Sequence, residues 1–316
     1  MTMKQGWEIK KLGEVFDLQM GKTPSRDNSD YWGGSNVWVA ISDLQDKYIG
    51  DSKEYITDQA LTETKIKKVK AGTTIMSFKL SVGRAAITTK DLYTNEAIMA
   101  FNLNEGYNLI ADYIYYYLKG YKWQGANKAV MGLTLNKASI SQNHIAIPPI
   151  EEQERIVAEL DCLSGVIEKK REQLKELDAL AESIFYTMFG DPITNEKGWK
   201  VKKWEDVFST KTGKLNANAM VENGKYPFFT CSKESYFIDE WAFDCEALLL
   251  AGNNATAQYD VKYYKGKFNA YQRTYVLTLK DDNNSYCYFK YALENKLSLL
   301  QEQSIGGMTT CFPMHI

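Results

Sequence analysis

Short loops that carry lysine, arginine, amide and hydroxyl side chains are the parts of this sequence best suited to chemistry. Two of them, residues 22–26 and 79–84, lie in the first half of the chain, and similar residues recur between positions 214 and 273. Lysine, arginine, asparagine and glutamine can hydrogen-bond base edges, and hydroxyl groups can bond phosphates. The candidate DNA-binding residues are Lys22, Thr23, Ser25, Arg26, Lys79, Ser81, Arg84, Lys214, Asn216, Asn253, Gln272 and Arg273.

Any one of these loops, taken alone, is better explained as ordinary solvated surface. Their recurrence in both halves of the chain favours a binding role for the set. A lysine-rich run, residues 65–70, is a further candidate for phosphate contact, and a solvated face is again the plainer alternative for it.

The familiar catalytic and cofactor-binding motifs are absent from the sequence. It contains no GxxxxGKS/T loop, no GxGxxG at the head of a βαβ unit, no HExxH and no GxSxG. Its only histidines, His144 and His315, are far apart, and its five cysteines show no CxxC spacing. The sequence therefore predicts no catalytic residue, no metal site and no cofactor bound by the chain itself.

Composition is that of a soluble globular protein, with 44% apolar and 25% charged residues and no signal-peptide pattern. The net charge of −2 is unevenly distributed. Residues 1–150 hold 18 Lys and Arg against 15 Asp and Glu, residues 151–190 hold 5 against 10, and residues 191–316 hold 15 against 15. The flanking regions are thus neutral to mildly basic, which permits DNA contact without demanding it. We expect a cytoplasmic protein with reduced cysteines and no membrane span.

Local patterns predict the elements that must position the loops. Residues 7–16 have the pattern of a short helix that enters a turn at residues 21–24. Further on, apolar and β-branched runs predict strands, and a tyrosine-rich segment predicts a helix. The expected strands are residues 37–41, 73–78, 85–89, 247–251 and 275–279, and the expected helix is residues 112–119.

An internal repeat organises the chain. Residues 6–22 and 198–214 are identical at eight of seventeen positions when they are aligned at an offset of 192. The tyrosine-rich segments at residues 113–118 and 288–293 align at an offset of 175. The predicted fold class is therefore α+β, with one domain type occurring twice. The expected divisions are residues 1–150, a central segment 151–190, and residues 191–316.

The central segment is predicted to be one long helix. Apolar residues recur along it at alternating steps of four and three, with a single interruption at Lys170, for more than four heptads. At 1.5 Å per residue, residues 151–189 would span roughly 58 Å. This seam indicates lengthwise packing against another helix; burial within one domain is the alternative. The seam residues are Ile156, Leu160, Leu163, Ile167, Leu174, Leu177, Ala181, Ile184 and Met188.

Two short motifs flank this helix. Residues 147–156 read Ile-Pro-Pro-Ile-Glu-Glu-Gln-Glu-Arg-Ile, and residues 188–192 read Met-Phe-Gly-Asp-Pro. Together with the repeated domain openings, which begin with Gly-Trp at positions 6 and 198, these motifs resemble the specificity subunit of type I restriction-modification systems. The resemblance covers the whole chain.

The resemblance implies a function and a set of partners. In that family each repeated domain is a target recognition domain that binds one half of a bipartite double-stranded DNA sequence. The helix between them sets the half-site spacing and docks modification (methyltransferase) subunits, which carry S-adenosylmethionine. A restriction subunit can join the complex. The specificity subunit itself is not an enzyme.

The sequence departs from the family pattern after the second copy. Family members carry a second long helix there, and this sequence stops before one. We therefore expect the end of the second domain to be incomplete and the seam to be covered in trans, by a second copy or a complementary fragment. The alternatives are a truncated or phase-varied subunit that is inactive or needs a partner fragment, a coiled-coil adaptor without a DNA role, and, less in keeping with the missing motifs, a fused restriction-methylation enzyme.

Overall fold

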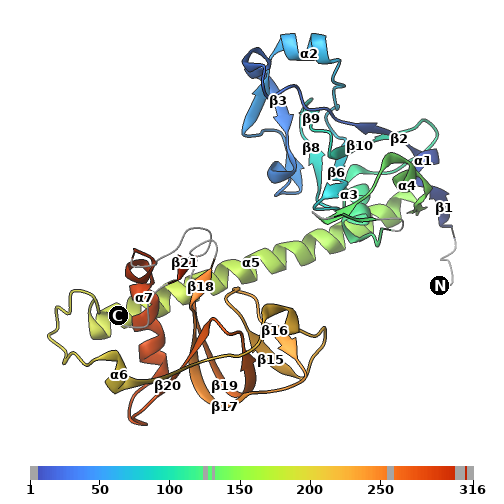
Figure 1. Ribbon diagram of the computed structural model, residues 1–316. Coiled ribbons are helices and arrows are strands. Elements are labelled where there is room, and N and C mark those ends of the chain that lie inside the picture. Colours follow the sequence, from blue (N-terminus) through green and yellow to red (C-terminus); the bar gives the residue numbers. More distant parts are fainter. Residues whose placement is uncertain (1–5, 124–126, 130–131, 255–259, 303–309, 312–316) are drawn as a thin grey trace. The chain divides into compact units, whose positions relative to one another are not determined.

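The computed structural model describes residues 6–123, 127–129, 132–254, 260–302 and 310–311. The chain divides into two compact units, Met1–Lys170 and Arg171–Ile316, each with its own sheet (Figure 1). The boundary falls inside one long helix, α5 (Ile150–Phe189), so that each unit contains one half of it. The predicted class, two β-sheet domains joined by a long helix, is confirmed.

The first unit is built on a five-stranded sheet in the order β2-β10-β6-β8-β4. β10 pairs antiparallel with β2 and β6, β6 pairs antiparallel with β8, and β4 joins the far side in parallel with β8. The strands are β2 (Phe16–Met20), β4 (Tyr48–Ile49), β6 (Thr74–Ser77), β8 (Ala85–Thr88) and β10 (Ile98–Leu103).

Smaller sheets extend this one. They have the orders β5-β3-β9, β11-β12-β7 and β1-β13. Their strands are β1 (Glu8–Lys11), β3 (Trp32–Val39), β5 (Glu54–Ile56), β7 (Lys79–Leu80), β9 (Tyr93–Thr94), β11 (Asn127–Ala129), β12 (Gly132–Thr134) and β13 (His144–Ile147). The short helices are α1 (Leu12–Val15), η1 (Ser29–Tyr31), η2 (Ile41–Asp43), α2 (Asp58–Thr64), α3 (Ala111–Gly120) and α4 (Lys137–Gln142).

The central sheet of the first unit is buried on both faces. Successive side chains of a strand point to opposite faces. On β6, Met76 joins a cluster with α1, α3 and α4, whereas Ile75 joins a second cluster on the other face with Val37 and Val39 of β3. The near-continuous apolar runs that predicted these strands follow from this two-sided burial.

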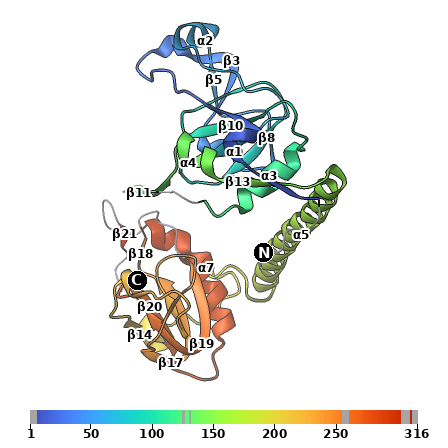
Figure 2. The same ribbon diagram turned by 90° about the vertical axis from the view of Figure 1, so that its right-hand side faces the viewer.

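The second unit has a six-stranded sheet in the order β14-β20-β17-β19-β15-β16. The helix α7 (Tyr286–Glu302) lies beside this sheet (Figure 2). It contributes Leu293 and Phe289 to the cluster on one face of the sheet. The remaining elements are α6 (Trp204–Val207), β14 (Phe208–Thr212), η3 (Ala217–Ala219), β15 (Tyr226–Phe229), β16 (Tyr236–Ile238), β17 (Phe243–Ala251), β18 (Asn253–Asn254), β19 (Val261–Ala270), β20 (Thr274–Leu279) and β21 (Thr310–Cys311).

The repeat seen in the sequence is a repeat of structure. α1 and β2 recur as α6 and β14 at the same offset of 192 residues, element by element. The strands that follow also correspond, because β2-β10-β6-β8 has the same order and directions as β14-β20-β17-β19. One fold has therefore been used twice.

The first element was predicted wrongly. Residues 7–16 form a strand, β1, and only four residues of helix, α1. The reason is tertiary: β1 pairs with β13, which lies more than 130 residues later in the chain, from Glu8 opposite Ile147 to Lys11 opposite His144. Local periodicity does not report such a pairing. No described helix is long and apolar enough to traverse a lipid bilayer.

Candidate nucleic-acid interface

The register of the strands brings the predicted loops of the first unit together at one edge of its sheet. This edge is formed by the ends of the strands, not by an outer strand. β2 ends where β10 begins, with Met20 opposite Met99. β6 ends at the same level, with Ser77 opposite Ile98, and β8 starts there, with Ala85 paired to Met76. The loops 22–26 and 79–84 and the turn before β10 therefore share this edge, although they are far apart in sequence.

A tight turn, residues 95–98, lies at the middle of this edge. The backbone N–H of Ile98 donates to the carbonyl of Asn95 (3.2 Å), and the N–H of Asn95 donates to the carbonyl of Val39 (3.0 Å). Gly21 packs against this turn so closely that a Cβ atom would collide with the carbonyl oxygens of Thr94 and Asn95. Glycine is required at this position for that reason.

Lys22 and Thr23 are both held by contacts within the unit. The Lys22 ammonium donates to the carbonyl of Thr64 (2.7 Å), at the end of α2. The Thr23 hydroxyl donates to the carboxylate of Glu96, the exposed second residue of the tight turn. These bonds fix both side chains at the edge.

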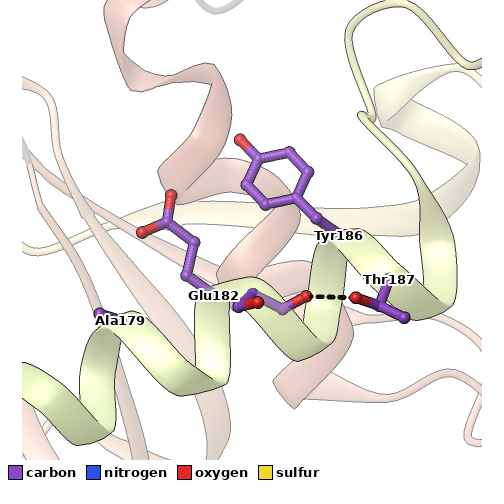
Figure 3. A pocket seen from close by; sticks show the side chains of 5 residues that line it. Ala179, Glu182, Tyr186 and Thr187 are labelled. Carbon is purple, nitrogen blue, oxygen red and sulfur yellow. Dashed lines mark hydrogen bonds between the residues drawn. The ribbon is translucent and has the colours of Figure 1, made fainter.

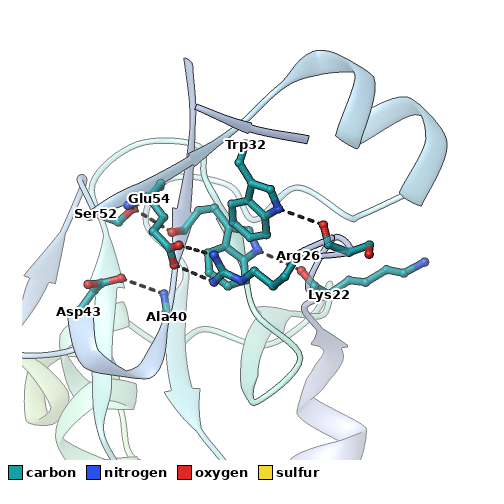
Figure 4. Close-up of polar contacts among 9 residues, drawn as sticks. Lys22, Arg26, Trp32, Ala40, Asp43, Ser52 and Glu54 are labelled. Atoms are coloured by element: carbon teal, nitrogen blue, oxygen red, sulfur yellow. Dashed lines mark hydrogen bonds and ion pairs between the residues drawn. The ribbon is translucent and has the colours of Figure 1, made fainter. Parts of the chain in front are cut away.

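Arg26 is fixed between a carboxylate and two indole rings (Figure 4). Both its terminal nitrogens donate to Glu54, one of them at 2.9 Å, and its guanidinium carbon lies 3.8 Å from the ring centroid of Trp32 and 5.1 Å from that of Trp38. The Glu54 contact raises the pKa of Arg26, and the Arg26 contact lowers the pKa of Glu54. Its charge is therefore partly neutralised before any ligand binds.

The second loop of the first unit presents its cations differently. Ser77 holds the base of this loop, since its backbone N–H donates to the carbonyl of Arg84 (2.8 Å). Lys79 lies 5.5 Å from the ring of Phe78, and the backbone N–H of Ser81 donates to the Lys79 carbonyl (2.8 Å). Arg84 is exposed, and its guanidinium has no partner among the described residues.

The second unit brings its candidates together by the same register. β14 and β17 both end where β20 begins, with Thr212 opposite Tyr275 and Ala251 opposite Thr274. This level of the sheet carries Lys214, Asn216, Asn253, Gln272 and Arg273. Asn253 starts β18, directly after the end of β17.

Contacts in the second unit tie two of these residues to each other. The Gln272 side-chain amide donates to the Asn216 side-chain oxygen (2.9 Å), and its backbone N–H donates to the carbonyl of Leu215 (2.9 Å). Lys214 and Arg273 are exposed, and neither side chain has a partner in the described part of the chain.

The lysine-rich run lies alongside β2. Ile66 and Val69 are buried, whereas the lysines between and beside them are exposed. The Gln19 amide of β2 donates to the carbonyl of Lys68 (3.1 Å), whose ammonium lies 3.5 Å from Asp91. With these two apolar side chains buried, the lysines of the segment face solvent.

Several residues of this edge were not among the sequence candidates. They are Glu54, Glu96, Trp32 and Trp38. The even spacing of the two tryptophans on one strand places them on the same face, and that spacing was available from the sequence. No local signal marked the two glutamates, because their partners are 28 and 73 residues away.

A family model described as the type I restriction modification DNA specificity domain matches residues 4–179 and 196–311. The chain belongs to this family. It is a specificity subunit that recognises DNA targets within a type I restriction-modification complex; by family it is not catalytic and carries no cofactor itself.

Relatives and solved structures agree with this assignment. The type I restriction enzyme MjaIX specificity subunit of Methanocaldococcus jannaschii is 25% identical over 95% of this chain and 73% of its own length. The EcoDI specificity subunit of Escherichia coli is 51% identical over 79 residues, which are 25% of this chain and 17% of that protein. A structure described as the basis of complex assembly and conformational transition of the type I R-M system has a TM-score of 0.50 at 15% identity, covering 99% of this chain and 88% of that one, which shows a common fold.

The start of α5 is anchored in this subunit by a buried amide. Gln153, from the Glu-Glu-Gln motif, is 0% exposed. Its side-chain oxygen accepts from the N–H of Ile110 (3.0 Å), and its nitrogen donates to the carbonyls of Asn108 and Pro148 (2.9 Å each). This polar anchor explains one residue of the motif that carried the family resemblance.

A partly buried cation adds to this anchor. The Lys47 ammonium lies 2.7 Å from Asp112 of α3 and 2.6 Å from Asp161 of α5. The Tyr116 hydroxyl also donates to Asp161 (2.5 Å). Burial opposes the charge of Lys47, but its two carboxylate partners outweigh burial and raise its pKa.

The end of α5 is held mainly by aromatic rings. Phe185 is 3% exposed and lies 5.2 Å from Phe189 and 5.5 Å from Tyr288 of α7, centroid to centroid. Lys197 caps the helix by donating to the carbonyls of Thr187 (2.6 Å) and Met188 (2.9 Å). The last carbonyls of a helix lack intrahelical partners, so this contact satisfies two of them.

The seam of α5 is largely uncovered. Ile156 is half-buried and packs against the core of the first unit. The later large seam residues are 48–62% exposed, and no described segment of their own unit covers them. They are Leu163, Ile167, Leu174, Leu177, Ile184 and Met188, while Leu160 and Ala181 are partly exposed.

A hollow of about 540 Å³ lies beside the last turns of α5 (Figure 3). Its lining comes from that helix alone, and the Thr187 hydroxyl donates to the Ser183 carbonyl within it (2.9 Å). The described residues contain no cluster of His, Cys, Asp and Glu that could hold a metal ion.

Proposed function

We propose that each unit binds one half of a bipartite DNA target through the sheet edge described above. The target recognition domains are residues 1–150 and 191–316, and residues 151–190 are the spacer helix. The observation that carries this proposal is the register, which brings the polar candidates of each unit to one edge. A single continuous edge per unit is what a contiguous half-site requires.

The edge residues fall into two groups, one proposed to contact DNA and one proposed to support the edge. Lys79, Arg84, Lys214 and Arg273 have no charged partner among the described residues, so they can bind phosphates or base edges without breaking an ion pair. Arg26, by contrast, would have to leave Glu54 to bind a base. We infer that Lys22, Thr23, Ser25 and Arg26 shape and support the edge of the first unit, whereas Lys79, Ser81 and Arg84 contact DNA most directly.

The spacer helix would fix the distance between the two DNA-binding units and would provide a docking surface. Its 40 residues correspond to roughly 60 Å of helix. We propose that it sets the half-site spacing and docks modification subunits, which carry S-adenosylmethionine, with a restriction subunit joining them. A cytoplasmic location, where chromosomal DNA is accessible, belongs to the same proposal.

The exposed seam supports a second element of the proposal, a helix supplied in trans. Six large apolar side chains in heptad spacing, each about half-exposed or more, favour a coiled-coil partner. A second copy of this chain or a complementary fragment would supply it. A subunit that needs such a partner before it supports modification is the alternative to an independently active one.

Reconstitution with type I modification subunits tests the proposal. Methylation mapping on genomic DNA should yield one bipartite motif, and the complex should give a salt-dependent footprint over both halves. Two charge-changing variants of α5 test the role of the seam. Leu174→Glu, in the seam, should weaken self-association measured by light scattering, whereas the control Glu172→Lys, on the solvent face, should not. A complex that binds all sequences equally would overturn the DNA-reading proposal.

A further inference from the structure

The two tight turns at the sheet edges carry different polar side chains at one equivalent position. In the first unit the turn runs from Asn95 to Ile98, and in the second it runs from Tyr271 to Thr274. Each is closed by the same bond, in which the fourth residue's N–H donates to the first residue's carbonyl, at 3.2 Å and 2.8 Å. The second residue of the turn is Glu96 in one unit and Gln272 in the other.

The surroundings of the turns confirm the equivalence. The first residue of each turn donates its N–H to the last residue of the neighbouring parallel strand, Val39 in one unit and Phe229 in the other. Gly21 and Gly213, which are equivalent in the sequence repeat, both approach these turns so closely that a Cβ would collide with backbone carbonyls. Glu96 and Gln272 thus occupy the same place in the two copies.

Each of these side chains is exposed and is held by one partner from the loop that follows the edge strand. The Thr23 hydroxyl donates to one oxygen of Glu96, which leaves the other oxygen free to accept. Asn216 accepts one N–H of Gln272, which leaves its second N–H and its carbonyl oxygen. The first unit therefore presents an acceptor, and the second presents a donor beside an acceptor.

We infer that Glu96 and Gln272 are specificity-determining residues that select different base pairs in the two half-sites. A carboxylate accepts from the N4 amino group of cytosine, whereas N7 of adenine or guanine would repel it. A side-chain amide matches N6 and N7 of adenine together. The first unit then favours a cytosine at one position of its half-site, and the second favours an adenine at the equivalent position.

This inference rests on the proposed function, and the test keeps the two apart. The complex with modification subunits is assayed on duplexes in which each half-site position is varied in turn. Glu96→Gln should change the preferred base at one position of one half-site, and Gln272→Glu should do so in the other, each by about 10-fold or more in relative binding. Preferences at all other positions should stay unchanged.

Two controls carry the same change of charge at the opposite edge of each sheet. Glu105→Gln follows the end of β10, and Asn283→Asp follows the end of β20; both residues are exposed. Neither should alter base preference. If the parent complex selects a bipartite site and both turn variants keep its preference, the inference fails and the proposed function stands. If the parent complex selects no sequence, the proposed function itself fails.

Discussion

The two units have the same backbone fold but differ in the side chains at equivalent positions of it. In both, an edge strand that starts with phenylalanine pairs with a later strand, and both strands meet the loops at the same level of the sheet. The first unit places an arginine between a glutamate and two tryptophans at its edge, whereas the second places two linked amides there. A duplicated fold can therefore keep its register while the groups that face a ligand change independently.

The units also differ in how they hold their halves of α5. The first uses a buried amide and a partly buried lysine, and the second uses packed aromatic rings. Hydrogen bonds restrict the orientation of the groups that they join, and an unpaired amide in a core destabilises the fold. The stability contributed by packed rings comes mainly from burial of apolar area. The two halves should consequently respond differently to mutation and to pH.

The largest effect is expected from the aromatic anchor of the second unit. Phe185→Ala should lower the free energy of unfolding by about 3–5 kcal/mol, because it removes a buried ring and leaves a cavity. Denaturant unfolding monitored by circular dichroism measures this change. Tyr186→Ala, at the neighbouring position whose side chain is 38% exposed, should cost less. Equal losses for the two variants would contradict the role given to Phe185.

The polar anchor of the first unit should come next. Gln153→Leu keeps the approximate volume but leaves the N–H of Ile110 and two carbonyls without partners, at a cost of about 2–3 kcal/mol. Gln142→Leu, at an exposed position on α4, is the matched control and should be nearly neutral. A neutral Gln153→Leu variant would show that apolar packing alone holds the start of α5.

Arginine variants sharpen the comparison within the first edge. Arg84→Ala should weaken specific DNA binding by about 1–3 kcal/mol if the side chain contacts a base bidentately. Titrations at several salt concentrations distinguish a phosphate role, which would weaken all sequences alike and reduce the salt dependence. Arg273→Ala should behave in the same way at the second edge.

Arg26→Ala should act differently, because Arg26 is already paired with Glu54 and stacked on Trp32. We expect a loss of thermal stability together with weaker binding, and Arg26→Lys should restore little, since lysine cannot form the bidentate contact. If Arg26→Ala impaired binding alone and left stability unchanged, its contacts within the edge would not be structural.

The smallest effect is a pH dependence of opposite sign in the two units. Burial alone would raise the pKa of Asp112, but hydrogen bonds from Lys47 and Tyr48 outweigh it and lower the pKa. Burial raises the pKa of Glu294, with Lys290 opposing it. Asp112 therefore stabilises the fold above about pH 4 and loses this contribution as the pH falls, whereas ionised Glu294 destabilises the fold as the pH rises above about 4.

Unfolding midpoints measured between pH 3 and pH 7 test this contrast. Asp112→Asn should destabilise the protein at pH 7 and have less effect at pH 3. Glu294→Gln should be more favourable at pH 7 than at pH 3. Parallel pH profiles for the two variants would refute the difference between the units.

Several features of this fold could be predicted from the sequence alone. The seventeen-residue repeat predicted the duplicated α+β domain, and the heptad seam predicted the long helix. The helix α5 begins one residue before the predicted segment and ends at its last residue. The helix periodicity is local, because it depends on residues only a few positions apart, and the repeat appears when two short segments are compared directly.

Only the tertiary structure decided what lies at the sheet edges. Met20 meets Met99 and Thr23 meets Glu96, across more than 70 residues of sequence, and no local pattern fixes those pairings. The equivalence of Glu96 and Gln272 was hidden for the same reason: the tyrosine-rich helices align at an offset of 175, whereas the edge turns align at 176. A strand's register is set by its partners, and a shift of one residue moves every side chain to the other face, so the positions that we propose to face the bases appear only once the sheet is formed.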